Sequence, residues 1–372
     1  MTLKQRYKWL DWNVIAMVLV IKILLLVFGY QAFKLFNQES VTSLYKVFEI
    51  WKHWDAEHYL KLGQMGYTGT GDDRFLIVYF PLLPALISIF SVFTRDYLIS
   101  AFLVSFIASL GLALAFKQLV KLDHTEGVSR YAVLFLFIFP TSYFLHIPYT
   151  ESLFLALVVG SFLAARKRYW LAAGLLGLLA GLTRINGLIL LPALAFEVWA
   201  EYRETKKINR NWFWLILVAG GFAGYLLLNY VVAGNPTIFM TYQREHWYKY
   251  LRLPYYGIIE AYNTAVTDKP EAALMRGFEE LLFVAIGLFA IIAGWFRMRG
   301  SYRVWMIGNW LLFVSTSFVL SVPRYTLILF PIFILMAQIA VKNWTARILF
   351  VTWSLLFLGM FATQYVRGWW AF

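Results

Sequence analysis

The chain alternates between long apolar runs and short polar connectors over almost its whole length. Many of the runs approach the roughly 20 consecutive apolar residues that a helix needs to cross the hydrocarbon layer of a membrane. The pattern therefore predicts an all-α polytopic membrane protein with about 11–12 transmembrane helices. The predicted spans are 13–33, 76–94, 97–116, 130–147, 151–166, 169–183, 185–201, 212–233, 277–297, 302–321, 324–341 and 346–366.

Composition supports this prediction and excludes a soluble protein. Of the 372 residues, 61% are hydrophobic and only 14% are charged, which is more apolar surface than a soluble domain could bury. No polar stretch is long enough to form a separate soluble domain, so residues 1–372 are predicted to be a single transmembrane domain. Cysteine is absent, which excludes disulfide bonds and thiol chemistry.

The net charge of +13 comes largely from basic clusters in the short connectors. Such clusters are typical of cytoplasmic loops in multi-pass membrane proteins, so the charge does not indicate a nucleic-acid partner. With these connectors inside, the long loops 34–75 and 234–276 fall on the outer face, where we expect the active site. The clusters are Lys4, Arg6 and Lys8; Arg166, Lys167 and Arg168; Arg203, Lys206, Lys207 and Arg210; and Arg297, Arg299 and Arg303.

Run 76–94 does not fit this topology as a full crossing. With 34–75 outside and the basic connector 117–130 inside, only one crossing can lie between them, yet two apolar runs are present. Pro81 and Pro84 interrupt helix geometry near the start of the run. They favour a re-entrant segment or an incomplete crossing. The alternative, a full crossing that places the connector outside, stays open.

The first outer loop carries an unusual polar segment, WKHWDAEHYLKLGQMGY (51–67). Just before it, residues 41–52 place apolar side chains, among them Leu44 and Trp51, at helical spacing. This spacing predicts a helix in the membrane plane with aromatic rings at headgroup depth. Asp55 is then expected to open a second short helix that Gly63 and Gly66 close.

Asp55 has two interpretations. Aspartate is a favoured N-cap of a helix, and a carboxylate fixed at a membrane surface also suits a general base that takes a proton from a substrate hydroxyl. In a helix that starts here, Asp55 shares a side with His58, as His53 would with Glu57. Carboxylate oxygens would suit Mg²⁺ or Mn²⁺. No strong ligand spacing supports a metal site, so no cofactor is predicted.

Three further charged residues stand out near the ends of predicted spans. Glu151 is either a carboxylate that the dipole of the following helix stabilises at its N-terminus, or a second acid that faces the same outer cavity as Asp55. Arg184 and Arg324 lie at outer ends of spans, against the usual distribution of basic residues. They are either structural ion pairs that reach toward headgroups or a clamp for a phosphate group, whose shape the guanidinium matches.

The second outer loop contains FMTYQREHWYKYLRLPYYG (239–257), which is dense in Tyr, Trp and Arg. One interpretation is an aromatic belt at the membrane interface. The other is a lid in which Gln243 and Trp247, one helical turn apart, contact a sugar or a prenyl chain.

Six motifs, in this order, resemble the GPI mannosyltransferase II (PIG-V) family of membrane glycosyltransferases, which have the GT-C fold. The resemblance extends over most of 50–341, and the chain would be a short, bacterial-type member. The motifs are WDAEHYLKLGQMGY, YFPLLPALI, FPTSYFLHIPYTESLFLAL, AGLLGLLAGLTRINGLILLPAL, NPTIFMTYQREHW and SVPRYTLILFPIFILMA.

This resemblance implies an inverting transferase that moves a sugar, with mannose as the expected one, from a polyprenyl-phosphate donor to a hydroxyl of a lipid or glycan acceptor. The reaction would take place on the non-cytoplasmic face. The family's Trp-Asp pair maps onto Trp54 and Asp55, which makes Asp55 the expected catalytic base. With the loop residues above, the expected substrate-binding residues are Trp54, Glu57, His58, Glu151, Arg184, Gln243, Trp247, Arg324 and Tyr325.

The expected location is the bacterial cell membrane, or the endoplasmic reticulum membrane in a eukaryote. The expected partners are the lipid-linked donor, the acceptor and membrane lipids, with no nucleic acid. The absence of a glycine-rich nucleotide-binding loop fits a lipid-linked donor. Two alternatives stay open: a flippase for a lipid-linked sugar, and a related enzyme that transfers an oligosaccharide. Transporters tend to place polar groups at mid-membrane between repeats, whereas the polar residues here lie in outer loops and no repeat is evident.

Overall fold

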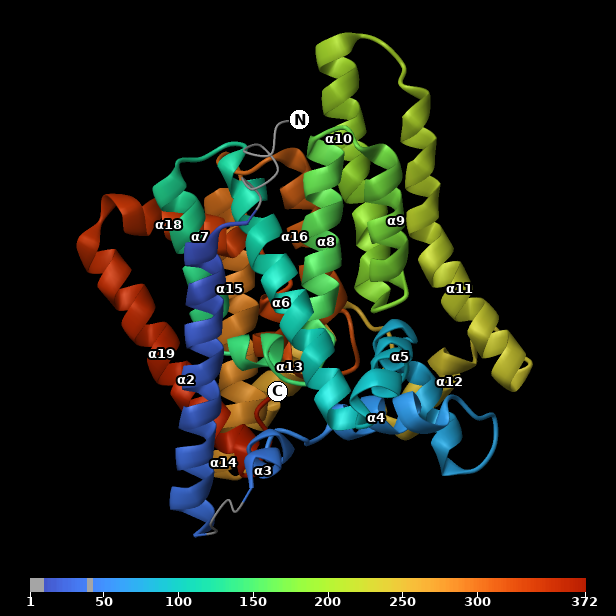
Figure 1. The fold of residues 1–372 in the computed structure, drawn as a ribbon, viewed down its shortest axis with the longest axis vertical. Helices are drawn as coiled ribbons and strands as arrows, with labels where there is room; N and C mark the ends of the chain where they lie inside the picture. The colour runs from blue at the N-terminus through green and yellow to red at the C-terminus, as the bar shows by residue number, and fades with distance from the viewer. Residues whose placement is uncertain (1–9, 39–42) are drawn as a thin grey trace.

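Apolar helices that run between two ends of the molecule make up most of the fold (Figure 1). The computed structural model describes residues 10–38 and 43–372, and in that part the only β-type pairing is an isolated bridge between Leu251 and Thr316. The apolar helices of the bundle are α2 (Trp12–Asn37), α6 (Tyr97–Lys121), α7 (Glu126–Ile138), α8 (Glu151–Arg166), α9 (Trp170–Gly181), α10 (Leu190–Thr205), α11 (Ile216–Ala233), α15 (Glu279–Gly294), α16 (Gly300–Val314), α18 (Pro331–Lys342) and α19 (Trp344–Val366).

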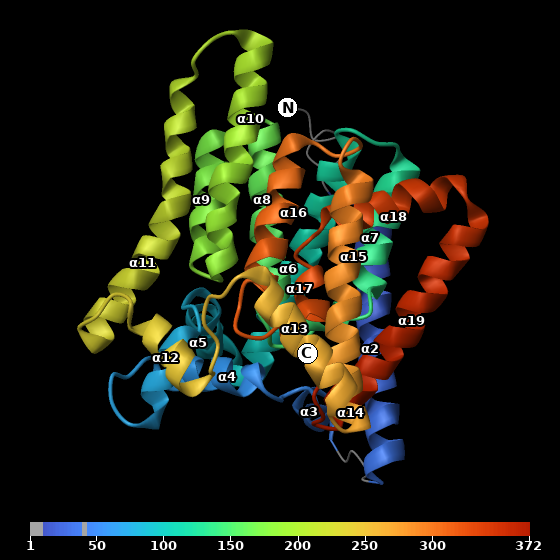
Figure 2. The ribbon, with the colours of Figure 1, turned by 180° about the vertical axis from the view of Figure 1, so that it is seen from behind.

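Shorter helices gather at one end, which lies at the bottom of Figure 1 and Figure 2 and is called the α4 end below. It carries α3 (Leu44–Glu49), α4 (Asp55–Met65), η2 (Asp72–Val78), α5 (Leu82–Thr94), α12 (Ile238–His246) and α14 (Pro270–Ala272). The remaining elements are η3 (Ser142–Leu145), η4 (Ile185–Ile189), η5 (Arg210–Leu215), α13 (Pro254–Thr267), η6 (Ala273–Phe278) and α17 (Val322–Thr326).

Six helical segments of the described chain are long and apolar enough to cross a membrane, or seven if one bent pair counts as a span. Other apolar runs form helices that are shorter than the sequence predicted, such as α9 and α18 with 12 residues each. The protein is an integral, multi-pass membrane protein, as predicted. The six segments are Trp12–Asn37, Tyr97–Lys121, Ile185–Thr205, Arg210–Ala233, Pro270–Gly294 and Trp344–Val366.

The basic connectors meet at the end opposite α4 (Figure 1). The carboxylate of Asp123 lies 2.7 Å from the guanidinium of Arg166 and 3.7 Å from that of Arg299. These ion pairs link three of the connectors. Lys117 is buried at the same end and pairs with Asp11. The structure thus places connector 117–130 with the other basic connectors. The N-terminal cluster of Lys4, Arg6 and Lys8 lies outside the described residues.

Run 76–94 turns back toward its own end of the bundle. The helices η2 and α5 meet at a bend of 108°, and α5 has only 13 residues. Both views show α5 beside α4, and the N–H of Leu82 donates to the carbonyl of Leu182 at 3.0 Å. This arrangement agrees with the predicted re-entrant or incomplete crossing, which Pro81 and Pro84 favour.

Trp51 is buried inside the protein and does not face the membrane interface, contrary to the prediction. Helix α3 ends at Glu49, and the Trp51 indole is fully buried between α2 and α19, stacked on Tyr365 with ring centroids 5.9 Å apart. A side-chain carbon at Gly29 of α2 would lie only 2.3 Å from this indole. The absence of a side chain at Gly29 therefore lets α2 anchor the loop that leads to Asp55. Residues 41 and 42 of the predicted in-plane helix lie outside the described residues.

We expect Gly29→Ala to lower the melting temperature of the purified protein, because overpacking of a filled contact costs about 1–3 kcal/mol. Gly111→Ala is the matched control, since a side chain at that position of α6 would meet nothing within 4 Å. Alanine also favours a helix over glycine, so the control should be as stable as the parent or more so. Equal melting temperatures for the two variants would contradict the packing described here.

Candidate active site

The turn before α4 holds Asp55 in a fixed place. Trp54 has a φ of 56°, a region that a residue other than glycine enters at a cost of about 1–3 kcal/mol. The carbonyl of His53 accepts hydrogen bonds from the hydroxyls of Tyr149 (3.2 Å) and Tyr365 (3.0 Å). These contacts to the bundle stabilise the strained turn.

Asp55 is the first residue of α4, and Trp54 occupies the N-cap position. The Asp55 carboxylate accepts a hydrogen bond from the Tyr79 hydroxyl at Oδ1 and another from Arg324 Nη1 at Oδ2, each 3.0 Å long. The interpretation of Asp55 as an N-cap is therefore wrong, because its oxygens bind side chains from distant segments. The helix ends at Gly66, whose φ is 73°, as predicted.

Two carboxylates and two guanidinium groups alternate in a row that begins at Asp55. Arg324 follows Asp55, and its Nε lies 3.2 Å from Glu151 Oε1. The same oxygen of Glu151 accepts a hydrogen bond of 2.5 Å from Arg184 Nη1, which also donates to Thr150 Oγ1 at 2.9 Å. Segments that are far apart in the sequence thus meet at one charged cluster, which we call the charge row (Asp55, Arg324, Glu151 and Arg184).

Burial differs along the charge row. The Glu151 side chain is fully buried and those of Arg324 and Arg184 are nearly so, whereas that of Asp55 is 28% exposed. Buried charges are tolerated in proteins only when they are paired, as here. Oε2 of Glu151 has no hydrogen-bond partner among the described residues. The row therefore opens toward solvent at Asp55 and keeps one acceptor atom free deeper inside.

Aromatic side chains enclose Asp55. The ring of Tyr79 contacts those of Tyr59, His58 and Trp247, with centroids 5.2, 5.1 and 6.1 Å away. Burial lowers the pKa of the His58 imidazole and raises the pKa of the Tyr59 hydroxyl. Both shifts favour the uncharged form of these side chains. His58 and Trp247 thus both contact Tyr79, the residue that donates to Asp55.

Tyr325 and Trp54 flank the charge row. The ring centroid of Tyr325 lies 5.1 Å from the guanidinium carbon of Arg184 and 5.1 Å from that of Arg324. The indole of Trp54 is 43% exposed and packs edge-on against Trp370, with centroids 5.3 Å apart. The Tyr325 ring is thus beside the two arginines, and Trp54, which directly precedes Asp55, remains accessible.

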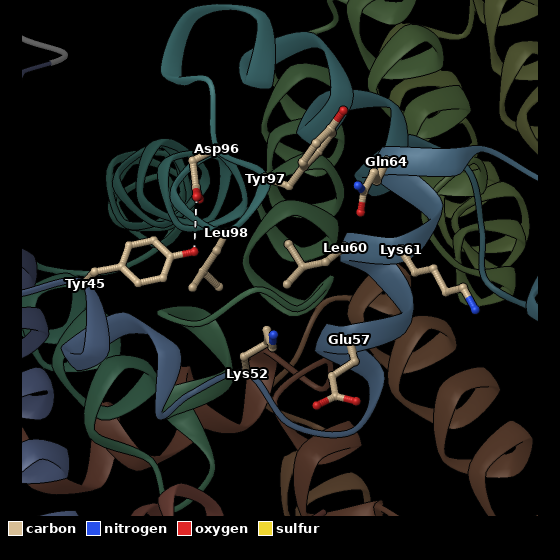
Figure 3. Close-up of a pocket in the computed structure, with 9 residues that line it drawn as sticks. All are labelled: Tyr45, Lys52, Glu57, Leu60, Lys61, Gln64, Asp96, Tyr97 and Leu98. Carbon is tan, nitrogen blue, oxygen red and sulfur yellow. Dashed lines mark hydrogen bonds between the residues drawn. The ribbon is translucent and has the colours of Figure 1, made fainter. Parts of the chain in front are cut away.

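Glu57 and Gln243 do not join the charge row. Glu57 is exposed and lines a separate hollow of about 410 Å³ between α4 and the start of α6 (Figure 3). On the far side of this hollow the Tyr45 hydroxyl donates to Asp96 at 3.1 Å. Gln243 lies on α12, where its backbone carbonyl accepts the N–H of Lys249 at 3.1 Å. The structure gives neither residue a contact with Asp55 among the described residues.

The sequence did not single out Tyr79 or Glu280. Tyr79 stands at the start of the YFPLLP motif but became a candidate only through its hydrogen bond to Asp55. Glu280 is fully buried in α15, where it accepts the backbone N–H groups of Ser321 (2.6 Å) and Val322 (2.7 Å). A carboxylate inside a predicted span is the signal that could have identified it. Glu280 fixes the start of α17, the short helix that carries Arg324.

We expect Glu280→Gln to reduce activity at least tenfold. The two backbone N–H groups each need an acceptor atom, and an amide side chain supplies only one oxygen. A buried polar group left unsatisfied costs about 1–3 kcal/mol, and α17 should shift with it. Glu279→Gln is the control, since Glu279 is also buried but one of its oxygens has no hydrogen-bond partner among the described residues. Activity and melting temperature are measured for both, and equal effects would contradict a specific role for Glu280.

Within residues 10–38 and 43–372, no three His, Asp or Glu side chains lie close enough together to hold a metal ion. The two carboxylates of the charge row are balanced by arginine instead. That the protein needs no metal or other cofactor stays a prediction.

Comparison with known proteins places the fold. No family model matches the chain, and no curated protein sequence is similar to it. The structure is similar to that of ArnT from Cupriavidus metallidurans bound to undecaprenyl phosphate, with a TM-score of 0.50 and 16% sequence identity. It is also similar to the apo oligosaccharyltransferase of Archaeoglobus fulgidus, with a TM-score of 0.50 and 13% identity. The chain has a GT-C-type fold.

The predicted fold class is thereby confirmed. The alignment covers 88% of this chain and 60% of ArnT, and 95% of this chain and 56% of the oligosaccharyltransferase. The chain thus spans less than two thirds of the length of either protein. Neither comparison supports the PIG-V family in particular, so that resemblance stays a prediction from the motifs.

Proposed function

We propose that the protein is a membrane glycosyltransferase that takes a sugar from a polyprenyl-phosphate donor and inverts the configuration at the anomeric carbon. The observation that supports this most is the position of Asp55. Its carboxylate is held by Tyr79 and Arg324, yet more than a quarter of the side chain is exposed. A general base needs such a fixed but accessible position.

Asp55 is the base in this proposal. An acceptor hydroxyl gives its proton to the Asp55 carboxylate while its oxygen attacks the anomeric carbon from the face opposite the phosphate. The bond from that carbon to the phosphate oxygen breaks, and the electron pair leaves with the polyprenyl phosphate. Protonation neutralises Asp55, so Arg324 loses one counter-charge just as the leaving phosphate gains a negative charge. Base and phosphate stabilisation are thereby coupled through one 3.0 Å contact.

Arg324 and Arg184 bind the donor phosphate in this proposal. Guanidinium groups match the geometry of phosphate oxygens, and each of these two carries donors beyond those already used for Glu151 and Asp55. Stabilising the charge that develops on a leaving group is a large contribution to catalysis in a site that excludes water. Glu151 holds both arginines in place.

The aromatic residues form the sugar and lipid contacts in this proposal. Tyr325 lies against the arginines of the charge row, Trp247 and His58 contact Tyr79, and Trp54 is exposed directly before Asp55. Gln243 and Glu57 would take part only through an arrangement different from that in the structure. In this proposal the active site faces the non-cytoplasmic side, and the basic connectors at the opposite end of the bundle support that orientation.

The structural comparison supports the donor class. The ArnT structure contains undecaprenyl phosphate, which is a polyprenyl phosphate, and the second protein is an oligosaccharyltransferase. Mannose as the sugar, and a lipid or glycan as the acceptor, rest on the motif resemblance to the PIG-V family.

The test is transfer by the purified protein. Labelled polyprenyl-phosphate mannose is incubated with the protein and a membrane lipid extract, and products are identified by mass and anomeric configuration. We expect a new glycosidic bond with inverted configuration. Movement of the donor across vesicle membranes without a new bond would instead indicate a flippase, and transfer of an oligosaccharide would indicate the related class of enzyme.

A further inference from the structure

Three cationic side chains surround the ring of Tyr325. The guanidinium carbons of Arg184 and Arg324 lie 5.1 Å from its centroid, and Lys249 Nζ lies 5.7 Å from it. Lys249 comes from the loop after α12, and its Nζ also lies 5.7 Å from the ring of Phe318. The sequence pointed to the two arginines but not to this lysine.

Lys249 differs from the two arginines in its partners. Arg324 lies within 4.0 Å of Asp55 and Glu151, and Arg184 lies within 4.0 Å of Glu151. No carboxylate of the described residues lies within that distance of Lys249. Glu280 is near enough for an electrostatic interaction with Lys249. However, the two oxygens of Glu280 accept hydrogen bonds from backbone N–H groups. Lys249 is therefore the cation at Tyr325 whose hydrogen-bond donors are not used by an acid.

The loop that carries Lys249 is held rigidly against residues 315–317. The N–H of Arg252 donates to the carbonyl of Ser315 at 3.0 Å, and that of Ser317 donates to the carbonyl of Tyr250 at 2.8 Å. The hydroxyl of Ser317 donates to the carbonyl of Tyr248 at 2.9 Å. Such fixed geometry means that a ligand of Lys249 need not order the loop first, which favours tight binding.

The backbone just before Lys249 is strained. Tyr248 has a φ of 55°, which a tyrosine adopts only where the surroundings impose it. Strained residues cluster at ligand-binding sites, and this one directs the next side chain over the rings of Tyr325 and Phe318. Trp54, before Asp55, has the same backbone feature. Each of the two outer loops thus has one strained aromatic residue directly before a charged residue that faces the site.

We propose that Lys249 binds the phosphate of the polyprenyl donor and remains bound to it as it leaves; this inference rests on the proposed function. A polyprenyl-phosphate sugar is a phosphodiester with one negative charge, whereas the polyprenyl phosphate that departs is a monoester with up to two. The extra charge needs a cation that is not already neutralised. An ammonium group with three donors supplies it, and the aromatic faces beneath it shield the contact from water.

The proposal predicts tighter binding of the monoester than of a neutral polyprenol, and it predicts that Lys249 accounts for much of the difference. A hydrogen bond between charged groups is strong enough that Lys249→Met should weaken binding of polyprenyl monophosphate by at least about tenfold. Lys249→Arg keeps the charge and should bind within a few-fold of the parent. Lys269→Gln is the control, since Lys269 is exposed in the same outer loop and lies outside the site.

The experiment measures binding of polyprenyl monophosphate to the full-length protein in nanodiscs of neutral lipid, with melting temperatures recorded for every variant. Selective loss in Lys249→Met with recovery in Lys249→Arg supports the proposal. Equal binding by the parent and Lys249→Met overturns it and leaves the proposed transferase intact. The same loss in Lys269→Gln also overturns it, because the effect would then be general charge attraction. If the parent does not bind the lipid, the donor class fails together with this inference.

Discussion

Asp55→Asn is expected to lower the rate of sugar transfer by roughly 10²–10⁴-fold, the usual contribution of a general base. An amide has nearly the shape of the carboxylate, and with its oxygen toward Arg324 it still accepts that hydrogen bond, while its NH2 group can donate to the Tyr79 hydroxyl. It cannot take the proton of the acceptor hydroxyl. The loss should therefore appear in kcat, with little change in KM for the donor, and the variant should insert into the membrane and fold.

The matched control is Asp72→Asn, which makes the same chemical change at an exposed position of the same outer loop. Its turnover should stay within a few-fold of the parent. Full activity in Asp55→Asn would remove the base assignment. A loss shared equally by both variants would show that carboxylates of this loop act only through their general charge.

Arg324→Gln should produce the largest combined loss of stability and activity. Arg324 lies between the carboxylates of Asp55 and Glu151, and it is buried. Removing one partner from a buried ion pair costs about 3–5 kcal/mol, because an uncompensated charge stays behind. We expect a large fall in melting temperature and no detectable transfer, since both the phosphate clamp and the orientation of Asp55 are lost.

A double-mutant cycle separates these two effects. In Asp55→Asn/Arg324→Gln, the uncompensated carboxylate at position 55 is gone, so the stability loss should be smaller than the sum of the single losses. Activity should not recover. Arg244→Gln, an exposed position on α12, is the control for the loss of a guanidinium. Strictly additive stability changes would contradict a direct interaction between Asp55 and Arg324.

The sequence predicted both the helical membrane fold and the residues of the charge row. The physical reason for the first prediction differs from that for the second. Spans follow from the length of apolar runs, which local sequence contains in full. Asp55 stood out in the polar segment of the first outer loop, and Glu151, Arg184 and Arg324 stood out because charged residues near the ends of spans need an explanation. The structure brings these four into one row, although their catalytic roles remain predictions.

Partners that come from distant segments could not be read from the sequence. Tyr79 and Glu280 act through hydrogen bonds to residues 24 to 42 positions away. Trp51 was expected at the membrane surface because its spacing fits an amphipathic helix, but Gly29 of another helix leaves room for it inside. A residue's type and spacing predict what it can do, and only the packing of the bundle decides which neighbour it meets.

Helix ends and loop contacts were the least predictable features. Asp55 has the right residue type for an N-cap, yet the strained Trp54 takes that position and frees the carboxylate. Glu57 is only two residues further along, but the helical turn directs it to another hollow (Figure 3). Residues adjacent in sequence therefore serve different surfaces of the same short helix.

The most direct measurement is an experimental structure of the protein with a phosphonate analogue of a polyprenyl-phosphate sugar, which cannot transfer its sugar. We predict that the phosphonate oxygens lie within hydrogen-bond distance of Arg324 or Arg184, with the anomeric carbon facing the Asp55 carboxylate across a gap wide enough for an acceptor hydroxyl. A headgroup bound at the opposite end of the bundle, among the basic connectors, would contradict the account.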